Sequence, residues 1–169
     1  PRFIDGMISY LAQRATNALR KAGFLARAVG VRIRYADFKT VDARRRLPRP
    51  SDFDDEILAL ARQLWRERYD RRVQLRLVGV VLHDLVPVGD RQLELPFGAT
   101  TISDAPPLPT PSDTYHGASL HREQLDAAVD RVRDRHGFGA LVRGNAVQLF
   151  GRLERSTRGF RLHTPACSR

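Results

Sequence analysis

The sequence predicts an α+β fold of the split β-α-β-β-α-β type, with two helices on one face of the sheet and the first strand missing. Two observations support this prediction. A helical pattern leads straight into two strand-like segments joined by a short turn, and a second helical pattern precedes the most strand-like run in the chain. The order helix, strand, strand, helix, strand is that of the split fold without the strand that would precede Pro1. A C-terminal helix and short strands are expected to follow.

The first expected element is a helix from Asp5, which would cap it, to about Ala22, with Gly23 as the stop. Apolar residues recur along it at spacings of three and four: Ile8, Leu11, Ala12, Ala15, Leu19 and Ala22.

Residues 28–47 predict two strands joined by a short turn, with arginines on one face. The first strand alternates between apolar residues that would face a core, Val29, Val31, Ile33 and Tyr35, and outward residues, Gly30, Arg32 and Arg34. From residue 27 to residue 49 there are eight Lys or Arg against only Asp37 and Asp42. Because guanidinium groups bond phosphate oxygens in pairs, this face suits phosphate; a merely solvated basic face stays open as the alternative.

A second helix is expected after Leu47-Pro48-Arg49-Pro50 breaks the second strand. Ser51 or Asp52 would cap it, acidic residues fill its first turn, and Arg71-Arg72 end it. Its apolar stripe consists of Ile57, Leu58, Ala61, Leu64 and Trp65, with Tyr69 as a further candidate. The run Val73 to Leu82 then predicts a central strand buried on much of both faces, with Arg76 joining the basic surface.

The remaining chain divides by composition. Residues 1–90 form the domain just described, residues 91–97 a short peptide, and residues 98–118 a proline-rich linker with too little apolar surface to fold. Residues 119–169 hold a helix from Leu120 to His136, one or two short strands within residues 140–150, and a basic tail. The apolar stripe of that helix is expected to pack on the rest of the chain, with contact to a partner as the alternative: Leu125, Ala128, Val129 and Val132.

The composition indicates a globular chain with an anionic partner. Its 169 residues are 42% hydrophobic, and 29 basic against 19 acidic residues give a net charge of +10. Nucleic acid is the commonest partner of so basic a domain. The lone Cys167 excludes an internal disulfide framework and a cysteine-based zinc site. No membrane-spanning run or signal peptide is recognisable, so we expect a monomeric cytoplasmic protein with no membrane partner.

We expect no catalytic or metal-ligating residues in this chain. The acidic run within residues 51–56 suits the dipole of a helix start better than a metal site. The histidines lack the spacing of zinc ligands, and neither a nucleophile motif nor a glycine-rich phosphate loop is present.

The ordered succession of these pieces resembles the C-terminal part of Y-family translesion DNA polymerases, closest to their bacterial polymerase IV branch. The pieces are LRKAGFLARAVGVRIRYADFKTV, RRRLPRPSDFDDEIL, RRVQLRLVGVVLHDLVP and QLELPF, and they extend over roughly Phe3 to Phe97. The stretch from Leu125 to Gly137 is also similar to a C-terminal helix and turn of longer relatives. The resemblance implies a little-finger domain, whose sheet of four strands backed by two helices grips duplex DNA, followed by a tail that binds the sliding clamp.

The function that the resemblance implies is non-catalytic. Such a module grips primer-template DNA and tethers the polymerase to the clamp during translesion synthesis and DNA repair in the SOS response. The family's two magnesium ions belong to an upstream palm domain, so no cofactor is expected here. The outward cations are expected at the sugar-phosphate backbone, with Arg45 pointing inward instead: Arg32, Arg34, Lys39, Arg44, Arg46 and Arg76.

The hexapeptide QLELPF fits the pattern Gln-Leu-x-Leu-x-Phe by which family members dock on the clamp. Its expected clamp-binding residues are Gln92, Leu93, Leu95 and Phe97. Leu95 and Phe97 can enter a preformed pocket while Gln92 bonds at its rim. The alternative is a short edge strand that packs Leu93, Leu95 and Phe97 on the domain.

Two other function classes stay open. A stand-alone α/β RNA-binding or protein-interaction module could share this topology, but an RNA-recognition sheet needs exposed aromatic rings, and the hairpin offers only Tyr35 and Phe38. An enzyme in its own right would need a catalytic constellation that the sequence does not contain.

Overall fold

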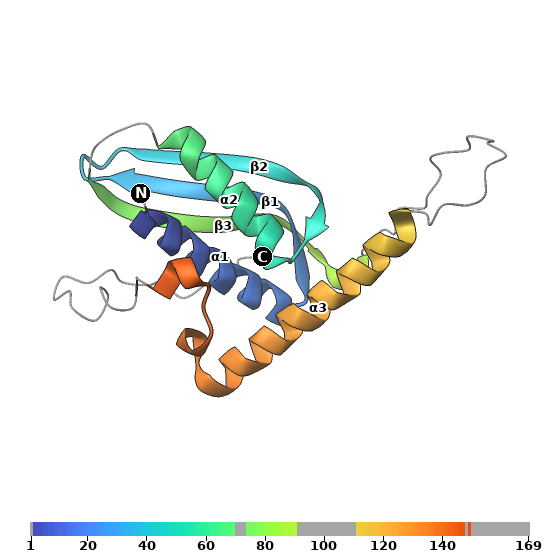
Figure 1. Ribbon diagram of the computed structural model, residues 1–169. Helices are drawn as coiled ribbons and strands as arrows, with labels where there is room; N and C mark the ends of the chain where they lie inside the picture. Colours follow the sequence, from blue (N-terminus) through green and yellow to red (C-terminus); the bar gives the residue numbers. More distant parts are fainter. Residues whose placement is uncertain (1, 70–73, 91–110, 148, 150–169) are drawn as a thin grey trace, which may run out of the picture.

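The architecture is a three-stranded antiparallel sheet, in the order β2-β1-β3, with helices on one face. The structure, a computed structural model, describes residues 2–69, 74–90, 111–147 and 149. The strands are β1 (Phe24–Tyr35), β2 (Thr40–Ser51) and β3 (Leu75–Pro87), and the helices are α1 (Arg2–Lys21), α2 (Asp54–Arg68) and α3 (Pro111–His136). Helices α1 and α2 cover the sheet, and α3 runs past the end of α1 (Figure 1). This arrangement confirms the predicted α+β fold class.

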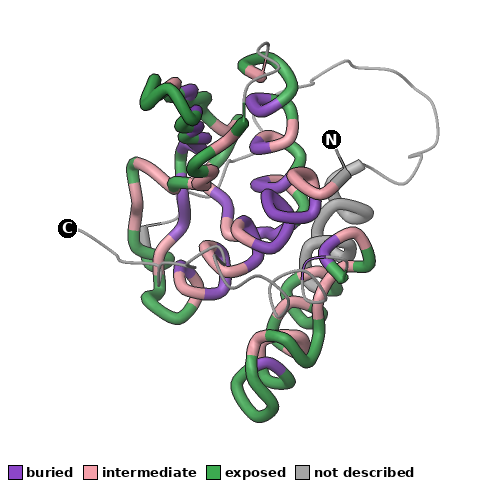
Figure 2. Tube along the Cα trace, turned by 90° about the vertical axis from the view of Figure 1, so that its left-hand side faces the viewer, coloured by how far each residue is buried: buried purple, intermediate pink, exposed green. Residues whose placement is uncertain are grey.

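The core lies between the sheet and its two covering helices, where the buried stretches gather (Figure 2). The inward residues of β1 are those that the alternation predicts, and all are buried: Val29, Val31, Ile33 and Tyr35. Across the sheet, Val31 is aligned with Ala43 on β2 and Val80 on β3. Fully burying each large aliphatic side chain contributes about 1.5–3 kcal/mol.

Helix α1 begins earlier than predicted, at Arg2, and Asp5 lies within it. The Asp5 carboxylate is no cap, because it accepts hydrogen bonds from Arg62 of α2 at 2.7 and 2.9 Å and from Asn145 at 3.0 Å. It joins α1 to α2 and to the C-terminal segment. The predicted stop is confirmed, since Gly23 has a φ of +71°, in the left-handed region that glycine adopts without strain.

Strand β2 does not end before its prolines, as the sequence suggested, but continues to Ser51. Ala28 of β1 is aligned with Arg46 and Ala26 with Ser51, so residues 47–50 stand opposite a single residue of β1. Proline has no N–H to donate and is tolerated at bulges and in edge strands. Both prolines, Pro48 and Pro50, lie in this bulge of an edge strand.

The predicted central position of the third strand is wrong, because β1 is central and β3 lies at an edge of the described sheet. Arg34 is aligned with Leu77 and Tyr35 with Leu75, so a bulge at Arg76 reverses the alternation there. Leu75 therefore packs on the core, while Leu77 is exposed.

Helix α2 begins at Asp54, after Phe53, and neither Ser51 nor Asp52 caps it. The Ser51 hydroxyl instead accepts a hydrogen bond from the Phe53 N–H at 3.2 Å, closing a turn just before the helix. The predicted stripe is confirmed in full for its first five residues, which are buried: Ile57, Leu58, Ala61, Leu64 and Trp65.

The C-terminal segment differs from the prediction at two points. Helix α3 begins at Pro111, so the last residues of the expected linker are helical; proline suits a first helical position, where its missing N–H costs nothing. In the part of residues 140–150 that the structure describes, 140–147 and 149, the short strands are not formed, and the 3-10 turns η2 (Phe138–Ala140) and η3 (Gly144–Ala146) lie there instead. A helical turn fits because Ala146 and Leu149, three residues apart, are both buried with Met7 and Tyr10 of α1. A further turn, η1 (Val88–Asp90), follows β3.

Candidate nucleic-acid interface

The sheet face opposite α1 and α2 carries most of the predicted DNA-binding cations. We call it the open face. The register places its residues in rows across the strands: Gly30, Arg32 and Arg34 of β1; Thr40, Asp42, Arg44 and Arg46 of β2; and Leu77, Gly79, Val81 and His83 of β3. Alternation along β1 therefore predicted the arginines correctly. Lys39 and Arg76 lie at one end of this face, beside the turn that joins β1 to β2.

Two arginines of the open face are already paired with carboxylates. Arg32 donates to Asp42 at 2.8 and 3.1 Å across the β1–β2 pair, and Arg44 donates to Asp84 of β3. These hydrogen bonds lower the pKa of the Asp42 and Asp84 carboxyls. Both pairs are exposed, so a phosphate could compete with either carboxylate.

The other predicted cations form no side-chain ion pair with a carboxylate of the described residues: Arg34, Lys39, Arg46 and Arg76. The charge of Arg46 nevertheless contributes to the lowered pKa of Asp84. Arg34 and Arg76 both lie over the ring of Phe38, with their guanidinium carbons 5.6 and 4.6 Å from the ring centre. Phe38 is exposed and lies in the turn, where strand alternation makes no prediction of its direction.

His83 is a residue of this face that the sequence did not single out. A Cβ atom at Gly30 would lie 2.7 Å from His83 Nε2, so glycine leaves the room that the imidazole occupies. Burial, with the nearby charge of Arg44, lowers the pKa of His83 below its ordinary value of 6.5. At neutral pH the imidazole is therefore uncharged and adds a hydrogen-bonding group among the arginines.

Arg45 points to the other side of the sheet, as its alternation predicts. Its guanidinium donates to Glu67 of α2 at 3.0 and 3.2 Å. Tyr35 is also turned inward and fully buried, so of the two aromatic residues of the hairpin only Phe38 is exposed.

The acidic residues at the start of α2 bind cations of the protein itself. Asp54 accepts from Arg20 at 3.0 Å, Asp55 accepts from Arg143, and Glu56 accepts from Arg49 at 3.3 Å. In the described part of the chain, no group of three or more His, Cys, Asp or Glu residues is arranged to hold a metal ion. Within the same ranges, no helix is long and apolar enough to cross a bilayer.

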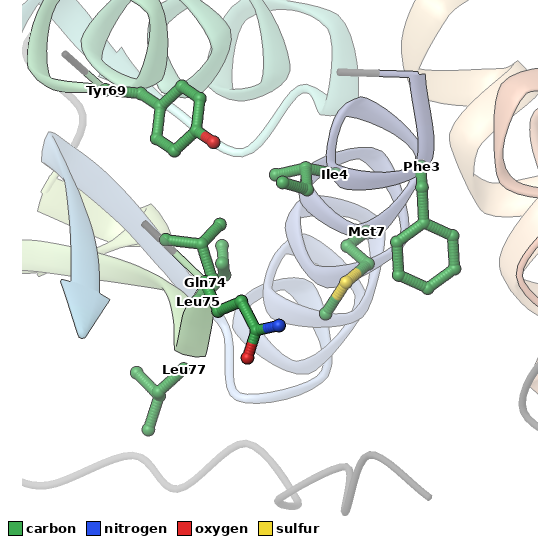
Figure 3. Close-up of a pocket in the computed structure, with 8 residues that line it drawn as sticks. Phe3, Ile4, Met7, Tyr69, Gln74, Leu75 and Leu77 are labelled. Atoms are coloured by element: carbon green, nitrogen blue, oxygen red, sulfur yellow. The ribbon is translucent and has the colours of Figure 1, made fainter. Parts of the chain in front are cut away.

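A pocket of about 230 Å³ lies between the start of α1, the end of α2 and the start of β3 (Figure 3). Its lining is mostly apolar: Phe3, Ile4, Met7, Tyr69, Gln74, Leu75, Leu77 and Val78. The lining contains an amide and a phenol but no carboxylate, imidazole or thiol, so we assign it no chemistry. The predicted clamp-binding residues Gln92, Leu93, Leu95 and Phe97 lie outside the described residues.

Comparison with known proteins identifies relatives of this chain. Residues 3–95 match the model of the impB/mucB/samB family C-terminal domain. The chain is 30% identical over 148 residues to the DNA polymerase IV of Dehalococcoides mccartyi strain CBDB1, a match that covers 87% of this chain and 33% of that protein. It is 29% identical over 148 residues to the DNA polymerase IV of Moorella thermoacetica, covering 88% of this chain and 32% of that protein. The chain thus spans about a third of the length of these curated relatives.

Proposed function

We propose that this chain, which belongs to the impB/mucB/samB family and contains the family's C-terminal domain, binds the sugar-phosphate backbone of primer-template DNA. It would do so as part of a polymerase IV-like enzyme. The observation that carries this proposal is the open face, together with the cations at its end. Of the six predicted cations, four form no side-chain ion pair with a carboxylate of the described residues: Arg34, Lys39, Arg46 and Arg76. An antiparallel sheet with one face packed on helices leaves its other face for a ligand, and unpaired cations attract a polyanion whatever its base sequence.

The proposal includes a tether to the sliding clamp. It rests on the hexapeptide Gln92 to Phe97, in which two large apolar side chains alternate near the end of an extended peptide. Binding to DNA and to the sliding clamp would together serve translesion synthesis and DNA repair in the cytoplasm. On this proposal the chain acts as a monomer.

We propose no nucleotidyl-transfer role for these residues. The two magnesium ions of the polymerase reaction would neutralise charge on the incoming nucleotide and belong, on this proposal, to a palm domain elsewhere in the protein. The carboxylates at the start of α2 do not fit them, because Arg20, Arg49 and Arg143 already bind these carboxylates.

A salt titration of duplex binding tests the grip. Each phosphate that an arginine neutralises adds about 0.9 to the magnitude of the log-log salt slope. Arg34→Ala, Arg46→Ala and Arg76→Ala should each flatten the slope by up to about that amount on two unrelated duplexes. Arg135→Ala, which removes an exposed cation of α3, is the matched control and should leave the slope unchanged. Equal slopes for all four variants and the parent would show that the open face is only solvated.

An RNA-binding module is the second candidate. The same titration, repeated with a single strand, distinguishes it from the first. Recognition of single strands by a sheet depends on rings that stack on bases. With Tyr35 buried, the hairpin exposes only Phe38, so duplex should be preferred to a single strand. Tighter binding to the single strand would favour RNA recognition instead.

A further inference from the structure

At the tip of the β1–β2 hairpin, two arginines lie against one aromatic ring. The guanidinium groups of Arg34 and Arg76 come from different strands and lie over the same ring, that of Phe38. No described carboxylate pairs with either of them. Two guanidinium groups repel each other, so in the absence of an anion they would be expected to spread apart. The fold brings them together, which is the arrangement that an anion would stabilise.

Two backbone irregularities produce this arrangement. The bulge in β3 makes Arg76 the extra residue between Leu75 and Leu77, and so turns it out of the strand's regular alternation. Phe38 has a φ of +63°, in the left-handed region that an aromatic residue rarely adopts. The turn holds it there, because the Phe38 N–H donates to the Tyr35 carbonyl at 3.0 Å and Asp37 accepts from the Lys39 N–H at 3.2 Å. Strained residues of this kind cluster at ligand sites.

We infer that Arg34 and Arg76 form a clamp for one phosphate group of the DNA backbone and that Phe38 is its positioning residue. The inference rests on the proposed function and makes it more specific, because it assigns a phosphate to the hairpin tip. The aromatic face attracts each cation and holds it in place, which prepares both for one anion. Phe38 touches the arginines and not the phosphate.

The ligand is a phosphate and not a base, because the ring is already in contact with two cations. A base that stacks on Phe38 would compete with the guanidinium groups for the ring. An anion can instead accept hydrogen bonds from both guanidinium groups while they stay on the ring. Lys39, in the same turn, adds a further positive charge at this end of the open face.

The first experiment is a set of duplex-binding measurements in which a charge-neutral substitution at Phe38 is made in two backgrounds of the whole chain. Phe38→Leu keeps every cation and should weaken binding about three- to ten-fold, since two contacts of cation and ring are lost. The same substitution in the Arg34→Ala/Arg76→Ala background should have no further effect, because nothing is left to position. Leu125→Ala, which truncates an exposed apolar residue of α3, is the matched control and should bind as the parent does.

The outcomes separate the clamp from the proposed function. If the parent does not bind duplex at all, the proposed function fails. If the parent and the arginine variants behave as expected but Phe38→Leu binds like the parent, the grip stands and the positioning role of Phe38 is overturned. An equal loss from Phe38→Leu in both backgrounds also overturns it, because the ring would then act without the arginines. Thermal melts of each variant confirm that the fold is kept.

A second experiment needs no DNA. Inorganic phosphate is titrated into the chain while the side-chain Nε–H resonances of Arg34 and Arg76 are followed by NMR. In the parent the two resonances should shift together with one apparent Kd, and in Phe38→Leu the shifts should become weaker and independent. Resonances that do not respond in the parent would overturn the clamp even if duplex binding is seen.

Discussion

Asp126 of α3 is a carboxylate whose protonation depends on its neighbours on three helices. Arg20 of α1 lies 3.7 Å from it, and Asp54 of α2 and Asp130 of α3 lie within the same cluster. Burial raises the pKa of Asp126 from 3.8 to about 6, the negative charge of Asp54 adds to this, and Arg20 opposes it. The folded protein therefore holds a proton on Asp126 at pH values where the unfolded chain has lost it.

This difference in proton binding predicts a stability that falls as pH rises from about 4 to about 6. In that window the folded state binds one proton more than the unfolded state, so the free energy of unfolding decreases with pH. Asp5 and Asp130 have lowered pKa values and act below 3.8, in the opposite direction. His83, whose pKa is lowered from 6.5, also acts in the opposite direction, at the upper end of the window, so the comparison with Asp126→Asn isolates the contribution of Asp126. Asp126→Asn should remove the decrease, as measured by denaturant unfolding at several pH values. A parent-like pH dependence in Asp126→Asn would contradict the assignment.

The sequence predicts the direction of a side chain well where it depends on local alternation. It does not predict which distant residue a side chain pairs with. The outward direction of Arg32, Arg34 and Arg44 followed from the period of the strand, and so did the inward direction of Arg45. The pairing of Arg44 with Asp84 did not, because these residues are forty positions apart and on strands that are not neighbours in the sheet.

The ion pairs of Arg32 with Asp42 and of Arg44 with Asp84 predict that removing either carboxylate increases the affinity for DNA. Asp42→Asn frees Arg32, and Asp84→Asn frees Arg44, so each should tighten duplex binding several-fold and steepen the salt slope by up to about 0.9. Asp134→Asn is the control, because it changes the net charge equally but frees Lys21, away from the open face. Equal gains in all three variants would mean that net charge alone acts.

At the scale of elements, sequence patterns with a period of two or 3.6 residues predicted β1, α1 and α2. They did not predict the bulges, which depend on how the strands pair. The bulges opposite Arg27 and at Arg76 arise from the alignment of one strand with another, which no local window contains. Helix α3 packs within the chain, but largely through charged residues and not through the whole of the expected apolar stripe. Leu125 and Val132 of its apolar stripe stay 63% and 38% exposed, whereas Arg133 is only 4% exposed.

The hexapeptide is an element whose role can be separated from folding. Changing Gln92, Leu95 and Phe97 together to Ala should abolish binding to the sliding clamp, because the anchoring side chains are lost. The melting temperature should stay nearly unchanged. Clamp binding is measured by surface plasmon resonance and stability by a thermal melt. A loss of several degrees in the triple variant would show that the segment packs as an edge strand.

At the scale of the whole molecule, two groups of charged residues lie on different sides of the layer formed by α1 and α2. One is the open face, and the other is the cluster of ion pairs that joins α3 to α1 and α2. The open face is on the far side of the sheet, whereas α3 contacts the helices (Figure 1). Arg20 joins three elements there, donating to Asp130 at 2.7 and 3.0 Å and to Asp54 at 3.0 Å. Arg133 donates to the Leu141 carbonyl at 3.1 Å and lies over the Phe138 ring, so it holds the turn after α3 in place.

This separation predicts that Arg20→Ala undocks α3 without changing DNA binding. Removing Arg20 takes the ion pair from Asp126 and leaves Asp54 and Asp130 only Arg133 as an ion-pair partner, at 3.9 and 3.6 Å. Because part of the buried network remains, the expected loss is about 3 kcal/mol of the free energy of unfolding. Lys21→Ala, the control, breaks only the exposed pair with Asp134 and should cost less than about 1 kcal/mol. Hydrogen exchange should show that α3 loses protection in Arg20→Ala while β1 keeps it. The salt slope of duplex binding should match the parent's, because every cation of the open face remains. A changed slope would show that the docking of α3 and the grip on DNA are coupled through the helices, and the two systems would then have to be treated as one.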